Sequence, residues 1–179
     1  IASQASAIGE CVASLGSGGL TAEEANAILL GLAEAYAEAM EELKNNHSAK
    51  MATKDEDEDV QEDVCAEDID AEIESSADGL TVAIGQLAKV TQPFFKQLFD
   101  PLLQKLVGTF KQDQEGEIHV RLALCLLDEV IESMEGYCAP YLPVFVPVLL
   151  QFCQNPSPAL RQAAIYGLGV AALSGAAEF

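Results

Sequence analysis

Apolar residues recur every three or four positions along almost the whole chain, with almost no sustained alternation of period two. This spacing is typical of amphipathic helices, so the sequence predicts an all-α protein. A capping box formed by Thr21 and Glu24 marks the start of the second helix. The prolines at 140, 143 and 147 should bend or delay the sixth. The predicted helices cover residues 1–15, 22–43, about 69 or 80 to 90, 93–110, 117–135, 137–153 and 158–173.

The second half of the chain matches itself when it is shifted by 40 residues. Three helices then share one apolar stripe, and the helices that precede the last two also align, so each unit is a helical hairpin. Two-helix units of about 40 residues that bury their apolar faces on one another are the signature of HEAT or armadillo repeats. A globular bundle with accidental self-similarity is the alternative. The equivalent positions are Leu80, Val120 and Leu160; Ala83, Ala123 and Ala163; Ile84, Leu124 and Ala164; Leu87, Leu127 and Gly167; Val90, Val130 and Val170.

Residues 155–170 form the most distinctive segment of the sequence. The stretch Asn155-Pro-Ser-Pro-Ala-Leu-Arg-Gln-Ala-Ala-Ile-Tyr-Gly-Leu-Gly-Val170 resembles the second helix of a HEAT repeat in the importin-beta superfamily, most of all in its karyopherin beta-three (importin five) branch. Three further features agree in order and spacing: Leu124-Cys-Leu-Leu-Asp-Glu-Val-Ile-Glu132, Leu20-Thr-Ala-Glu-Glu24, and the acidic run from Asp55. The resemblance implies a HEAT-repeat solenoid, an alpha-alpha superhelix, of about four repeats. It also implies a nuclear import receptor that carries protein cargo through nuclear pores under the control of Ran.

The resemblance divides the chain into repeats. Residues 1–15 would be the second helix of a truncated repeat, 21–90 a repeat with an acidic insertion at 46–67, and 93–135 and 137–174 two further repeats. Because the chain starts at Ile1 and ends within an apolar pattern, it is expected to be a fragment of a longer protein. The expected location is the cytoplasm and the nucleus, with shuttling between them.

Charge is distributed unevenly. The formal net charge is −20, and 13 of the 29 acidic residues lie between Asp55 and Asp78, where there is no basic residue. A chain that is half apolar should still form a folded core. The scarcity of Lys and Arg disfavours direct nucleic-acid binding, and no apolar run is long enough to cross a membrane. Dense like charge without an apolar face predicts a mobile loop over residues 45–67.

This acidic insertion is the first candidate site. It could attract basic cargo segments or the basic face of Ran through its field, and the alternative is a floppy insertion that only adds solubility. The candidate protein-binding residues are Asp55, Glu56, Asp57, Glu58, Asp59, Glu62 and Asp63.

Two further sets of residues belong to the helices. Asp128, Glu132 and Glu135 share a face opposite the apolar stripe of the helix 117–135. In importins the second helix of each repeat lines the concave surface, so the resemblance implies that these acids face basic cargo or Ran. An ordinary solvated face is the alternative. Arg121 and Arg161 occupy equivalent positions and are expected to form a ladder between repeats through turn residues such as Asp113, Glu115 or Asn155, with ligand binding as the alternative.

The sequence does not match the known catalytic or metal-binding motifs. The acidic run has Val60 where a calcium loop needs Gly, and His47 and His119 stand alone, so no metal or cofactor and no enzymatic activity are expected. Aromatic residues of the first helices could instead contact the phenylalanines of FG nucleoporins, or they could form core between repeats: Phe94, Phe95, Phe99, Tyr137, Tyr141 and Phe145. The alternative functions are a HEAT scaffold for other protein partners and an acidic chaperone for histones or ribosomal proteins.

Overall fold

The computed structural model describes residues 2–53, 60–110 and 116–174 of the chain, and these residues are almost entirely helical. No strand occurs within those ranges, which confirms the all-α prediction. The elements are α1 (Ala2–Leu15), α2 (Ala22–Thr53), α3 (Val60–Val90), α4 (Gln92–Thr109), α5 (Glu117–Met134), the 3-10 helix η1 (Glu135–Tyr141), α6 (Leu142–Phe152) and α7 (Pro158–Ser174).

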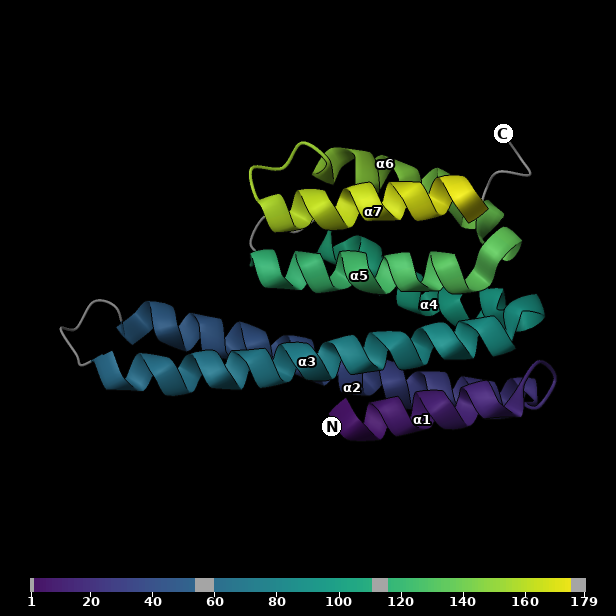
Figure 1. Cartoon of the computed structure of the whole chain (residues 1–179), viewed down its shortest axis with the longest axis horizontal. Helices are drawn as coiled ribbons and strands as arrows, with labels where there is room; N and C mark the ends of the chain where they lie inside the picture. Colours follow the sequence, from purple (N-terminus) through teal and green to yellow (C-terminus); the bar gives the residue numbers. More distant parts are fainter. Residues whose placement is uncertain (1, 54–59, 111–115, 175–179) are drawn as a thin grey trace.

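The helices form two layers that run through successive hairpins (Figure 1). The second helices of the hairpins, α3, α5 and α7, lie side by side with α1 in one layer, and α2, α4 and α6 lie behind them. The helices α3 and α5 therefore each contact their own first helix and a neighbour of the same layer on both sides, whereas α7 has such a neighbour, α5, on one side. This arrangement is a HEAT-like solenoid, in which neighbouring repeats bury one another's apolar faces. The apolar stripe found from the 40-residue shift is buried throughout, except for the half-buried Ala163.

Local sequence signals define the ends of several helices. The Thr21 backbone N–H donates to the Glu24 carboxylate at 2.9 Å, and the Glu24 N–H donates back to the Thr21 hydroxyl at 3.2 Å, so the predicted capping box is confirmed. Gly16 and Gly18 adopt φ values of +67° and +86° in the turn before it. Near Pro140 the chain forms η1, and the regular helix α6 is delayed to Leu142, as the prolines predict.

An aromatic layer joins the first helices of the last two repeats. Phe99 of α4 stacks on Phe95 with ring centroids 5.4 Å apart and meets Tyr141 and Phe145 edge-on at 5.7 and 6.5 Å. All four rings are buried. They form core between repeats, whereas Phe94 is half-buried and Tyr137 is exposed. Of the six aromatics considered for nucleoporin contacts, only these last two lie at the surface.

The prediction of a mobile loop over residues 45–67 is wrong for most of that segment. Both α2 and α3 continue past the stacked repeats as a two-helix arm, which comprises residues 44–53 and 60–70 (Figure 1). At its base the Asn46 side-chain amide donates to the Asp70 carboxylate at 3.3 Å. Helices that are already formed propagate cheaply, and Ala, Glu, Lys and Met favour that propagation, whereas like-charge pairs cost only tenths of a kcal/mol each. No helix among the described residues is long and apolar enough to span a membrane.

Candidate protein-binding groove

A groove of about 490 Å³ lies over α5 on the layer of second helices. Its floor is α5, and its walls are α3 on one side and α7 on the other, because α5 is held between these two helices. We call it the α5 groove. It is lined by Asp78, Thr81 and Val82 of α3, by Arg121, Cys125, Asp128 and Glu129 of α5, and by Ala159, Gln162, Ala163 and Tyr166 of α7.

Asp128 has an unusual environment for a carboxyl group. Its side chain is only 3 % exposed, and its Oδ1 atom has no hydrogen-bond partner among the described residues. The carboxyl lies directly against the backbone of Gly167 on α7, where a Cβ atom would overlap it. Burial, and to a lesser extent the neighbouring charge of Glu132, raises the pKa of Asp128 to about 8. The carboxyl therefore retains its proton at neutral pH.

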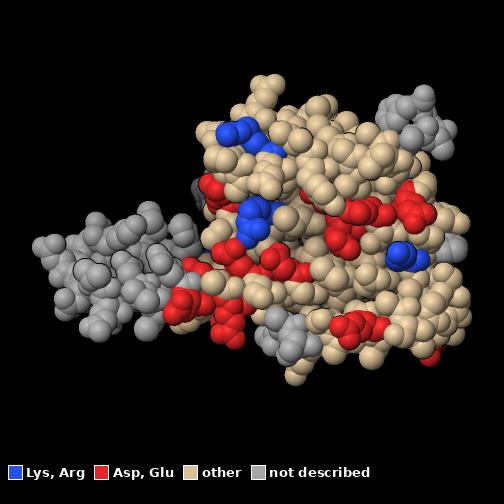
Figure 2. All heavy atoms as spheres, in the orientation of Figure 1, with Lys and Arg blue, Asp and Glu red and all other residues tan. Residues whose placement is uncertain are grey.

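The carboxylates beside Asp128 make the groove acidic. Glu129 lies against Gly85 of α3, and burial raises its pKa as well. Glu132 is exposed and accepts a hydrogen bond from the Tyr166 hydroxyl at 2.7 Å, which fixes the tyrosine ring across the α5–α7 boundary. Figure 2 shows acidic side chains gathered in a band over α3 and α5 on this face of the molecule. The potential over the groove is therefore suited to cations.

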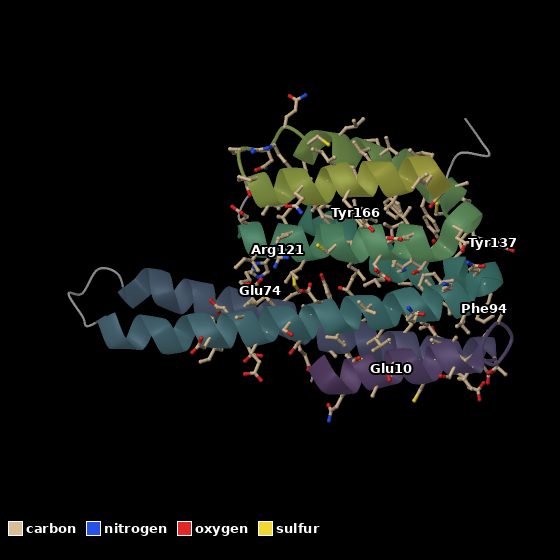
Figure 3. The ribbon with its side chains drawn as sticks, viewed as in Figure 1. Glu10, Glu74, Phe94, Arg121, Tyr137 and Tyr166 are labelled. Carbon is tan, nitrogen blue, oxygen red and sulfur yellow. The ribbon has the colours of Figure 1, made fainter. Side chains whose placement is uncertain are left out.

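A salt bridge closes the other end of the α5 groove. The Arg121 guanidinium of α5 donates to the Glu74 carboxylate of α3 at 2.5 Å, and the two side chains point toward one another across the repeat boundary (Figure 3). Between this salt bridge and Asp128 lies Cys125, where burial raises the pKa of the thiol. The thiol is therefore protonated and forms an apolar part of the floor. The groove is thus apolar along its middle and acidic at one end.

The three acids predicted to share one exposed face of α5 lie in different environments. Glu132 is exposed, as expected. Asp128 is buried, contrary to the expected open face, because a second helix in the stack packs on three sides and only a narrow stripe remains open. Glu135 is exposed, but it follows the end of α5 and adopts a φ of +49° as the first residue of η1. The expectation that these acids face a cargo channel remains a prediction.

The two arginines at equivalent positions make different contacts. Arg121 reaches the preceding repeat through the helical residue Glu74. Of the turn residues expected to join the ladder, Asp113 and Glu115 lie outside the described residues. Arg161 donates to the main-chain carbonyls of Asn155 and Pro156 at 2.8 and 2.7 Å, within its own loop. A direct link between equivalent positions is made instead by the Ser157 hydroxyl, which donates to the Glu117 carboxylate at 2.6 Å.

The acidic insertion lies partly outside the described residues. Asp55, Glu56, Asp57, Glu58 and Asp59 belong to the segment that the structure does not describe, and of Glu62 and Asp63 only the helical backbone of α3 is described. Within the described part of the chain, no group of His, Cys, Asp or Glu side chains is arranged to hold a metal ion.

Several groove residues carry no sequence pattern that predicts their role. Glu129, Thr81 and Tyr166 have no distinctive spacing of their own, and they come together only because α3, α5 and α7 are neighbours. A glycine inside a second helix is a sequence signal for close packing against a neighbouring helix. Gly85 and Gly167 each sit where an α5 carboxylate approaches a neighbouring backbone, which is the close helix packing expected of an interior glycine.

A comparison with known protein families accounts for this architecture. The family model described as Importin repeat 6 matches residues 1–112, which is more than half of the chain and covers α1 to α4. The groove itself is completed by α5 and α7, which lie beyond the matched residues.

Proposed function

Because the chain belongs to the importin repeat 6 family, we propose that its layer of second helices contributes to the capture of protein cargo by a nuclear transport receptor. Membership places the chain among HEAT-repeat proteins of the nuclear transport receptor type, a transport and scaffold family rather than an enzymatic one. The finer proposal is that basic segments of cargo bind in the α5 groove. The observation that carries it is the acidic band over α3 and α5 at a groove with an apolar middle.

The chemistry of the groove suits the side chain of lysine. Val82, Ala163 and the Tyr166 ring offer apolar surface for an aliphatic stem, and Glu129 and Glu132 provide charge for its ammonium group. Exposed acids contribute mainly through long-range attraction, so the interaction should be fast and sensitive to salt.

Charge reversal in the groove tests this proposal. The probe is a fluorescently labelled, lysine-rich peptide with blocked ends, and its binding to the 179-residue chain is followed by anisotropy. Glu129→Lys and Glu132→Lys should each weaken binding several-fold, and the loss should shrink as the salt concentration rises from about 50 to about 300 mM. Glu10→Lys is the matched control, because Glu10 is exposed on α1 and its reversal changes the net charge equally (Figure 3). Equal losses in all three variants would assign the binding to net charge alone and would contradict the groove.

The finer identity of the receptor also belongs to this proposal. We place the chain in the karyopherin beta-three branch, with release of cargo by RanGTP, contact with FG nucleoporins and shuttling between cytoplasm and nucleus. A pull-down with Ran loaded with GTP or GDP tests the Ran part, and equal recovery with both nucleotides would contradict it. Deletion of residues 55–63 tests the acidic insertion: an unchanged affinity and an unchanged salt slope for the basic peptide would remove that segment from the proposal.

A further inference from the structure

We propose that Asp128 couples binding in the α5 groove to the release of a proton, so that entry of a cationic side chain expels the proton that this carboxyl carries in the empty groove. The inference rests on the proposed function, because it concerns the same groove and the same class of partner. It adds a regulatory property: the groove holds basic segments more tightly at higher pH within the physiological range.

The groups that line the groove do not compensate a charge on the Asp128 carboxyl. Its side chain is 3 % exposed, and Oδ1 has no hydrogen-bond partner in the ranges that the structure describes. On the α7 side it meets the Gly167 backbone, and the Leu149 side chain of α6 packs at the same glycine, so this side is apolar. A charged carboxylate in such a place is strongly disfavoured, and the group avoids the cost by keeping its proton.

The other charged groups around the groove do not relieve this burial. Glu129 and Glu132 on α5 and Asp78 on α3 add negative charge. The nearest cation in the groove lining is Arg121, which is already engaged by the carboxylate of Glu74. On α7 the Tyr166 hydroxyl donates to Glu132 and is therefore not available to Asp128. These charged groups and the tyrosine hydroxyl thus either favour the protonated acid or are committed elsewhere.

A second buried polar group faces the same groove. Thr81 of α3 lines the wall beside the α5 floor, is 5 % exposed, and its hydroxyl oxygen also lacks a hydrogen-bond partner within the described ranges. An ammonium group has three N–H donors, which can be shared among a carboxylate, a hydroxyl and the half-buried Glu129. Asp128 and Thr81 lie on the neighbouring helices α5 and α3, and such a group would satisfy both unpartnered oxygens. The cation replaces the proton on Asp128, and the proton passes to solvent.

The linkage predicts a specific dependence of affinity on pH. If the ammonium binds only the ionised carboxylate, the apparent Kd follows the ionised fraction of a group with a pKa of about 8. Binding of the lysine-rich peptide should then weaken about fivefold from pH 8 to pH 7, and about ninefold more from pH 7 to pH 6. The peptide stays fully charged over this range, since the pKa of lysine is about 10.4.

Two measurements on the full chain test the proposal. Peptide affinity is followed from pH 6 to pH 8 for the wild type, for Asp128→Asn, and for Glu10→Gln as a control that removes an exposed acid. The wild type and Glu10→Gln should show the slope, and Asp128→Asn should be flat and close to the wild-type affinity at pH 6. His47 and His119 are present in all three proteins, so a slope caused by histidine would persist in Asp128→Asn and would overturn the proposal.

Calorimetry decides the question even if Asp128→Asn fails to fold. Binding of the same peptide to the wild type at pH 7, measured in buffers with different enthalpies of ionisation, should release about 0.9 proton. Binding with no proton release and no dependence on pH would overturn the linkage and leave the groove proposal intact. Absence of peptide binding at every pH would overturn the groove proposal and the linkage together.

Discussion

Replacement of the buried acid by its neutral isostere should change how stability depends on pH. Asp128→Asn keeps the shape of the side chain at the Gly167 contact but removes the ionisable proton. In the wild type the folded state raises the pKa of Asp128 from 3.8 to about 8, mainly through burial. Between these two values the folded protein holds a proton that the unfolded chain has lost. The free energy of unfolding must therefore fall as the pH rises through this window.

The size of the effect follows from the same two pKa values. Each pH unit well inside the window costs about 1.4 kcal/mol, so the wild type should lose about 4 kcal/mol between pH 5 and pH 8 through this group alone. Asp128→Asn should not show this loss. The variant should consequently gain about 4 kcal/mol relative to the wild type over the same range, whatever the constant offset between them.

Chemical denaturation followed by circular dichroism at several pH values measures this difference. The many other acids titrate almost identically in both proteins, so their contributions cancel in the comparison. Glu10→Gln serves as a control, because Glu10 is exposed and its loss should leave the wild-type curve unchanged in shape. A difference between wild type and Asp128→Asn that stays constant from pH 5 to pH 8 would refute the assignment of a buried, protonated acid.

Three further changes probe the packing of the repeats, each by urea denaturation. Phe99→Ala should destabilise the fold by about 3–5 kcal/mol, since its fully buried ring joins two successive first helices; a loss below about 1 kcal/mol would contradict that role. Gly167→Ala should cost about 1–3 kcal/mol through overlap with the carboxyl beneath it, whereas Gly169→Ala, which meets nothing, should stabilise slightly. A double-mutant cycle on Arg121 and Glu74, which are about a quarter exposed, should give a coupling of up to about 1 kcal/mol. A coupling of zero would show that the salt bridge does not stabilise the boundary between the repeats.

Much of the architecture could be predicted because it is encoded locally and then repeated. Positions such as Leu80, Val120 and Leu160 indicate the apolar stripe, since every repeat must bury the same face against its neighbours. The capping box at Thr21 and the prolines near the start of α6 act within a single turn of helix, so their effects could also be predicted from the sequence. Such local signals can be interpreted without knowing which helices become neighbours in the folded protein.

The arm and the groove could not be predicted on the same basis. The dense like charge of the acidic stretch predicts a loop, but α2 and α3 are held together where they leave the repeats, and helix propagation then costs little. The residue spacing of α5 alone predicts an open face for Asp128. Its burial depends on α7, through the glycine at position 167, and so belongs to the stack rather than to the helix.

The two-helix arm makes the stack mechanically asymmetric. Because α3 runs without interruption from the stacked repeats into the arm, any tilt of its packed portion is transmitted to residues 60–69, which extend about 15 Å further at about 1.5 Å per residue. A tilt of about 10° would move the far end of this stretch by about 3 Å, while the packed end hardly shifts. The arm is therefore a lever that magnifies small rotations between repeats. A pair of spin labels, one on the arm and one on α7, would read those rotations as changes in distance.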